Sequence, residues 1–194
     1  IPEVVSVVSN PEDTVPYRLP ETCPSCGEVI TRVEGEAAAR CTNPQCPAQL
    51  MRNLIHFASR DAMDIDGLGP AALEQLSAAL RVHSPADLYD ITAQELETLD
   101  RFGKKSAENL VAAIERSKGN DLSRLLFAFG IRQVGQKAGK ILAQRFGSLD
   151  NLQSATVEEL TQVDDIGAIT AQSIVDWFAS PQSQPLIARL KEAG

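Results

Sequence analysis

The chain has 194 residues, with 18 Lys or Arg against 26 Asp or Glu and a net charge of −8. This length suits one ordinary domain and a smaller satellite, and the acidic balance argues against a protein that binds nucleic acid through bulk positive charge. The chain opens on Ile1 and contains neither a secretion signal nor an apolar run long enough to span a membrane. We therefore expect a soluble, cytoplasmic piece of a longer protein that does not contact a membrane.

Positive charge is nevertheless concentrated in one segment. Between Arg101 and Arg145 there are ten basic residues and three acidic ones, a net charge of +7, which leaves −15 for the rest of the chain. This segment can face phosphate groups while the remainder stays acidic.

The first predicted element is a β-strand. The opening residues IPEVVSVV are rich in β-branched side chains and are followed by the loop SNPEDTVP, a combination that is typical of a strand end. We interpret this stretch as the last strand of a larger β-structured domain.

All four cysteines lie in the next segment, CPSCGEVITRVEGEAAARCTNPQC, as Cys23, Cys26, Cys41 and Cys46. Four sulfurs at this spacing suit a closed tetrahedral zinc site that is structural rather than catalytic. Two disulfides or free thiols are the alternative, and we favour zinc because nothing marks the chain as secreted. The residues between the cysteine pairs predict a β-hairpin that turns at Glu34-Gly35-Glu36.

After the cysteines, Leu, Ala and Ile recur at three- and four-residue spacing, which indicates that the rest of the chain is helical. The predicted helices lie near 48–60, 70–80, 93–99, 105–117, 121–128, 137–146, 157–162 and 170–178.

This helical region contains an internal duplication. Residues 84–103 align without a gap on residues 148–167, with seven identities in twenty, and IDGLG at 65–69 matches IRQVG at 131–135. Four turns therefore end in a glycine that follows an apolar residue and precedes a predicted helix. These glycines are Gly69, Gly103, Gly135 and Gly167.

The repeated turn predicts a binding site for phosphate. A helix N-terminus offers free amides and the positive end of the helix dipole, and a residue without a Cβ allows close approach. Lys104 and Lys105 follow Gly103, and Lys137 follows Gly135, so two turns also carry cations. Four such turns on one rigid body would follow a DNA backbone without reading its sequence. The alternative is that each glycine only permits a positive φ in a tight turn.

The cysteine segment together with MRNLIHFASRDAMDIDGLG, TLDRFGKKSAENLVAAIE, LLFAFGIRQVGQKAGKIL and VDDIGAITAQSIVDWF resembles the zinc finger and helix-hairpin-helix domain of bacterial NAD-dependent DNA ligases. The resemblance covers essentially the whole chain. It implies a mainly α fold with a tandem helix-hairpin-helix domain of four motifs at 49–194, preceded by a small β-rich zinc finger at 17–48. Residues 1–16 resemble the end of that family's oligonucleotide-binding (OB) fold barrel.

In this family the hairpin domain grips the minor groove of double-stranded DNA around a nick, in replication and repair. The resemblance therefore implies a monomer that binds nicked duplex regardless of sequence, with a structural zinc on the four cysteines. The glycines that would present backbone amides to DNA are Gly67, Gly69, Gly103, Gly135 and Gly167.

The turns depart from the idealised hairpin, which has two glycines two residues apart. Only the first turn keeps both, as Gly67 and Gly69. Asp164 and Asp165 add negative charge beside Gly167, so we expect the weakest phosphate contact at the fourth turn. The earlier position of the other turns is held by Arg101, Gln133 and Asp165.

The family's chemistry uses a lysine in a Lys-x-Asp-Gly motif that takes AMP from NAD. The Asp-Gly of this chain, at Asp66-Gly67, is preceded by Asp64 in place of that lysine. We therefore expect no catalytic or cofactor-binding residue here, and NAD and magnesium only in the full-length parent enzyme. The alternatives are a stand-alone helix-hairpin-helix glycosylase or lyase with Lys104 or Lys137 as nucleophile, and a non-catalytic repair scaffold that recruits a protein.

Overall fold

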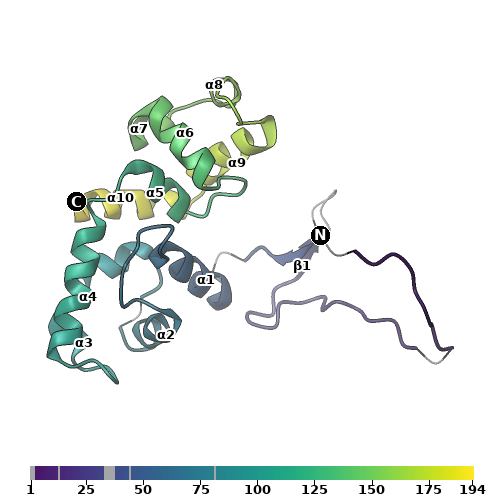
Figure 1. Cartoon of the computed structure of the whole chain (residues 1–194), viewed down its shortest axis with the longest axis horizontal. Helices are drawn as coiled ribbons and strands as arrows, with labels where there is room; N and C mark the ends of the chain where they lie inside the picture. Colours follow the sequence, from purple (N-terminus) through teal and green to yellow (C-terminus); the bar gives the residue numbers. More distant parts are fainter. Residues whose placement is uncertain (1–2, 13, 33–37, 44, 81) are drawn as a thin grey trace. The chain divides into compact units, whose positions relative to one another are not determined.

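The computed structural model describes residues 3–12, 14–32, 38–43, 45–80 and 82–194. It divides the chain into two compact units, Ile1–Cys46 and Pro47–Gly194 (Figure 1). Among the described residues, both strands belong to the first unit and all helices to the second. No helix in these described ranges is long and apolar enough to cross a membrane.

A short β-hairpin is the regular structure of the first unit. β1 (Ile30–Arg32) pairs antiparallel with β2 (Ala39–Cys41), and an isolated bridge joins Thr22 to Val29. This pairing confirms the predicted hairpin, whose expected turn at 34–36 lies outside the described residues.

The strand predicted for the opening residues is not formed by residues 3–12. The side chains of Val4, Val5, Val7 and Val8 are between 76% and 99% exposed. A strand needs a neighbour to satisfy its backbone groups, and the sheet of the described residues consists of β1 and β2 alone. The assignment of this segment to an OB-fold barrel therefore stays a prediction.

Helices are the only regular secondary structure among the described residues of the second unit. All eight predicted helices are present, with ends that differ by three residues at most, whereas η1, α7 and α10 were not predicted. In order, the helices are α1 (Pro47–Ala58), α2 (Pro70–Ala79), the 3-10 helix η1 (Pro85–Asp90), α3 (Ala93–Leu96), α4 (Lys104–Ser117), α5 (Leu122–Ala128), α6 (Gln136–Phe146), α7 (Leu149–Gln153), α8 (Val157–Thr161), α9 (Ala168–Ala179) and α10 (Ser183–Ala193).

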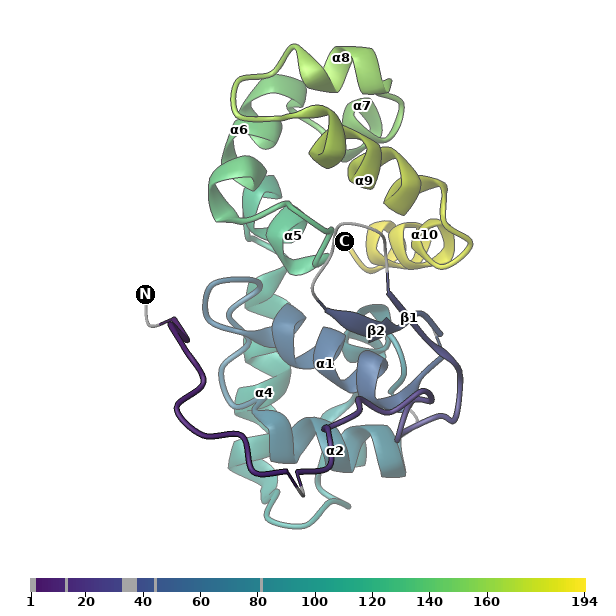
Figure 2. The same ribbon diagram turned by 90° about the vertical axis from the view of Figure 1, so that its right-hand side faces the viewer.

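The duplicated sequence builds two halves, each around its own core. The first half (residues 47–117, α1–α4) buries Leu54, Phe57 and Leu88, and the second half (residues 136–179, α6–α9) buries Leu152 and Phe178. In both Figure 1 and Figure 2, α5 and α10 lie between the two halves.

The helix that follows each turn glycine packs into the core of its half through the same two positions. Residues four and seven places after the glycine share one helix face, and all of them are buried. The pairs are Leu73 and Leu76, Ala107 and Leu110, Gly139 and Leu142, and Ala171 and Ile174. At Gly139 an added Cβ would lie 2.9 Å from the carbonyl oxygen of Ser123, so α6 packs on α5 only without a side chain there.

Candidate metal centre and nucleic-acid interface

The four cysteines converge on one point of the first unit. Their Sγ atoms lie within 4.8 Å of one another, with Cys23 to Cys46 at 3.8 Å and Cys26 to Cys41 at 3.5 Å. Tetrahedral zinc with Zn–S bonds of about 2.3 Å places its sulfur ligands roughly 3.8 Å apart, so the arrangement fits this metal. None of the four is in a disulfide, and the disulfide alternative is therefore wrong.

Local backbone structure and charge both favour a cation among these sulfurs. Hydrogen bonds from the backbone of Ser25 and then of Cys26 lower the pKa of the Cys23 thiol. A backbone hydrogen bond from Asn43 lowers the pKa of Cys41, but burial and the neighbouring thiols outweigh it and raise that pKa to about 12. Four thiolates at these distances repel one another unless a cation lies between them. The cluster is a structural zinc site, with all four positions filled by sulfur.

The four glycine turns of the second unit share one backbone geometry. In each, the amide of the fourth residue donates to the carbonyl of the first, over 3.0 to 3.2 Å; Leu68 to Ile65 is one example. The third residue is left-handed, as in a type II turn. These third residues are Gly67 (φ +84°), Arg101 (+68°), Gln133 (+65°) and Asp165 (+65°).

The turn glycines themselves are not left-handed. Gly69, Gly103, Gly135 and Gly167 have φ between −79° and −93° and are the N-caps of α2, α4, α6 and α9. A Cβ added at any of these four would meet nothing within 4 Å in the described chain. The explanation of these glycines by a positive φ is therefore wrong, and internal packing does not explain them either.

The glycine-capped helices also differ in their capping from most other helices of the second unit, although α10, whose N-cap is Gln182, likewise has no side-chain cap. Side-chain oxygens accept first-turn amides at η1, α3, α5, α7 and α8, whereas α2, α4, α6 and α9 have no side-chain cap. At α4, Ser106 Oγ accepts the amide of Gly103 at 2.9 Å. The amides of the helix residues that follow Gly103 have no side-chain acceptor among the described residues. Amides without an intrahelical partner are thus presented at the four turns.

The basic side chains beside the turns lie in two different settings. Lys104 and Lys105 are exposed, and no ion pair to either is present among the described residues. Lys137 instead pairs with Asp165 of the fourth turn, at 2.7 Å between Nζ and Oδ2. Beside the fourth turn, the first turn of α9 presents an apolar side chain and no lysine: Ile169 is 76% exposed. The lysines that the sequence grouped together therefore differ in their pairing: Lys137 is in an ion pair, whereas Lys104 and Lys105 are in none among the described residues.

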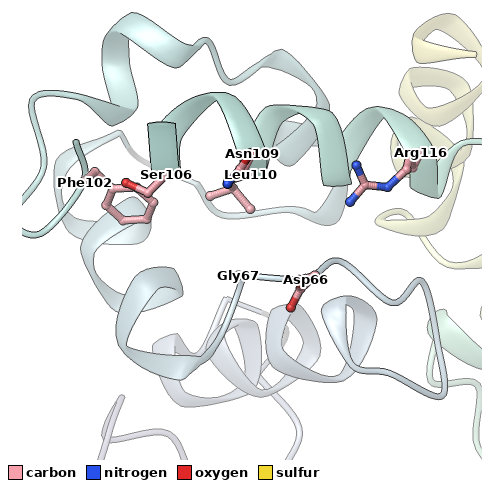
Figure 3. A pocket seen from close by; sticks show the side chains of 7 residues that line it. All are labelled: Asp66, Gly67, Phe102, Ser106, Asn109, Leu110 and Arg116. Carbon is pink, nitrogen blue, oxygen red and sulfur yellow. The ribbon is translucent and has the colours of Figure 1, made fainter. Parts of the chain in front are cut away.

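A cavity of about 340 Å³ lies between the first turn and helix α4, with Phe102 of the second turn at one end (Figure 3). Asn109 and Arg116 of α4 line it, and neither was predicted from the sequence as a site residue. Their spacing from Ser106 along one face of α4 was the available signal. The full lining consists of Asp66, Gly67, Phe102, Ser106, Asn109, Leu110 and Arg116.

Family comparisons agree with this geometry. Residues 22–48 match the NAD-dependent DNA ligase C4 zinc finger domain, residues 59–116 match the SAM-like helix-hairpin-helix tandem, and residues 124–187 match the helix-hairpin-helix motif. The chain is therefore a zinc-finger protein with tandem helix-hairpin-helix motifs, a class of motif that binds DNA.

Individual relatives narrow this class to one family. The DNA ligases of Heliobacterium modesticaldum and Pelotomaculum thermopropionicum are each 53% identical to this chain over 196 residues, and that of Brevibacillus brevis is 48% identical over 198. Each match covers the whole chain but only 29% or 30% of the relative. The chain belongs to the bacterial NAD-dependent DNA ligase family, and it corresponds to the zinc finger and helix-hairpin-helix region of these ligases.

Proposed function

We propose that the second unit binds the sugar-phosphate backbone of double-stranded DNA through its four turns, regardless of base sequence. In its parent ligase it would hold the minor groove around a nick. The observation that carries this proposal is the set of four glycine N-caps, because neither backbone conformation nor internal packing requires glycine at any of them. Glycine is itself a favourable N-cap, but Ser, Thr and Asp cap at least as well, as they do at η1, α3 and α5. We therefore attribute the missing side chain at all four turns to the close approach of an external partner.

The exposed groups at each turn suit a phosphate oxygen. Amides at a helix N-terminus donate to it, and the helix dipole favours the negative charge by about 0.3 to 1 kcal/mol at an exposed site. Phosphate carries no information about the base attached to it, so such contacts set position without reading sequence. Gly67, Lys104, Lys105 and Lys137 join the four N-cap glycines in this proposed contact surface.

In this proposal the first unit has a structural role beside the DNA-binding unit and takes no part in catalysis. A segment of this size buries too little apolar surface to fold by itself, so zinc binding supplies much of its stability. We propose the domain division 1–16 for the end of the OB-fold barrel, 17–48 for the zinc finger and 49–194 for the DNA-binding domain.

Nick sealing with NAD and magnesium belongs, in this proposal, to the full-length parent enzyme, which acts in the cytoplasm. Asp64 occupies the position where the adenylylated lysine would stand, so this chain is proposed to be inactive alone. Incubation with NAD and mass spectrometry test this, and an AMP adduct would contradict it.

Binding to nicked and intact duplexes of unrelated sequence, by the monomeric chain, tests the function. We expect equal affinity across sequences and a linear fall of log K with log salt, at a slope of roughly −0.9 for each neutralised phosphate. A marked base preference, or no binding at low salt, would contradict the proposal. Cleavage of an abasic duplex by the chain would favour the glycosylase or lyase alternative.

A further inference from the structure

The unpredicted helix α10 lies at the junction of the two halves in both views (Figure 1, Figure 2). Ile187 of α10 is 3% exposed and belongs to the second core. Leu190, one turn later, packs against the first core. A single helix thus contributes apolar contacts to both halves.

Arg189 connects α10 to η1 of the first half. Its Nη1 pairs with Asp87 and its Nη2 with Asp90. Asp87 is itself held in place, because its Oδ2 accepts the amides of His83 at 2.8 Å and Ser84 at 2.7 Å. The planar guanidinium has its nitrogens in fixed positions, so two carboxylates fix its orientation as well as its distance.

Other residues of α10 hold it to the second half. Gln184 Nε2 donates to the carbonyl oxygen of Phe178 at 2.8 Å, and Lys191 pairs with Asp150 of α7. Lys191 therefore acts within one side of the junction, whereas Arg189 spans it.

Elsewhere the junction is held along α5 and the residues before it. Asn120 Nδ2 donates to the carbonyl of Met63 at 2.8 Å, His56 Nε2 lies 2.7 Å from the carbonyl oxygen of Phe127, and Leu126 enters the second core. If the Arg189 bridge were cut, this side would remain and the halves could change their mutual angle about it.

We propose that Arg189 is a positioning residue, which fixes the second pair of turns relative to the first so that both pairs contact one duplex at once. Its effect on DNA rests on the function proposed above. Two linked binding modules gain avidity only when their geometry allows both to engage, and that gain falls when the geometry is loosened.

The chain offers a matched pair of variants for the test. Arg189→Ala and Lys191→Ala each remove one positive charge from the last turns of α10, but only Arg189→Ala breaks ion pairs between α10 and the first half. Long-range attraction to DNA therefore changes equally in both. Asp90→Asn is a milder third variant that leaves the hydrogen bonds of Asp87 intact.

The first measurement needs no DNA. Labels introduced as unnatural amino acids at exposed Glu74 of α2 and exposed Glu158 of α8 report the distance between the halves without using the zinc-binding cysteines. We expect one narrow distance distribution in the parent chain and in Lys191→Ala, and a broader one in Arg189→Ala. An Arg189→Ala distribution as narrow as that of the parent would overturn the proposal.

The second measurement uses a short duplex that one pair of turns can cover and a longer duplex that both pairs can cover. Arg189→Ala should lose about tenfold in affinity for the longer duplex relative to Lys191→Ala and keep its affinity for the short one. Equal affinities of the two variants for the longer duplex would also overturn it.

These two readouts separate the inference from the proposed function. If the parent chain binds no DNA, the proposed function fails while the distance measurement still decides the role of Arg189. If Arg189→Ala does not fold, Asp90→Asn carries the test, with an intermediate broadening expected and an unchanged distribution counting against the proposal.

Discussion

Nζ of Lys137 lies 2.7 Å from Oδ2 of Asp165, so the cation of the third turn is held by the acid of the fourth. A hydrogen bond and the charge of Asp165 raise the pKa of Lys137. Both side chains are largely exposed, and such a pair adds little to stability. Its importance is electrostatic, because a phosphate nearby encounters a nearly neutral pair instead of a free lysine.

We therefore expect Asp165→Asn to bind duplex DNA more tightly than the parent and to steepen the salt dependence by about one unit, as for one added phosphate contact. Titrations at several salt concentrations measure both effects. Asp164→Asn is the control, since it changes the net charge equally without releasing Lys137. Identical salt slopes for the two variants would show that the ion pair does not matter for binding.

The left-handed third residue of a turn gives a prediction about stability. At Gln133, with φ +65°, an L side chain costs roughly 1 to 2 kcal/mol, while glycine would lose about 0.4 to 1 kcal/mol through the entropy of the unfolded chain. Gln133→Gly should therefore raise the free energy of unfolding by about 0.5 to 1 kcal/mol, seen as a higher melting temperature. The reverse change, Gly67→Gln, should lower it. A less stable Gln133→Gly would mean that the side chain makes a favourable contact.

The turns could be predicted from sequence because they repeat, and repetition is visible without coordinates. What the repeat did not give is the backbone conformation: the strained position is that of Gln133 and its equivalents, whereas Gly135 is extended. The short helices η1 and α7 were missed, although each begins at a serine N-cap, Ser84 or Ser148, which is a sequence signal for the start of a helix. Helix α10 was missed because Pro181 and Pro185 interrupt its start, although Pro185 lies in the first turn, where proline is tolerated.

Pairings between distant residues were beyond sequence reasoning. Arg189 and Asp87 are 102 positions apart and come together only through the packing of α10 on both cores. The same holds for Lys137 and Asp165, whose acid was predicted only to repel phosphate. The four cysteines were predictable, because metal chemistry fixes both their number and their spacing.

Removal of zinc should unfold the first unit alone. Elemental analysis should return about one zinc per chain. A strong chelator should abolish the ordered signals of residues near 20–48 while the helical circular dichroism of the second unit persists. Cys41→Ala should act in the same direction. Loss of both units together would show that the helical unit depends on the zinc finger.

Asp87 gives a pH prediction. Burial alone would raise its pKa, but hydrogen bonds from Arg189 and from the amides of His83 and Ser84 outweigh burial and lower it. A lowered folded-state pKa contributes stability above the unfolded value, near 4, and that stability is lost as the pH falls through the folded pKa. The parent should therefore exceed Arg189→Ala in stability at neutral pH by more than it does at low pH. Denaturant unfolding at several pH values measures this, and a difference that grows on acidification would contradict it.

The central claim, that the turn glycines admit a DNA backbone, is tested most directly by Gly103→Ser and Gly135→Ser. Serine suits an extended N-cap and its hydroxyl accepts a first-turn amide, so both variants should melt no lower than the parent. Both should nevertheless bind duplex DNA several-fold more weakly, because the Cβ blocks approach and the hydroxyl occupies an amide. Gly167→Ser, with the same local geometry, should lose least. If the first two variants fold normally and bind as tightly as the parent at two salt concentrations, the glycines are turn residues only and the DNA-gripping account is contradicted.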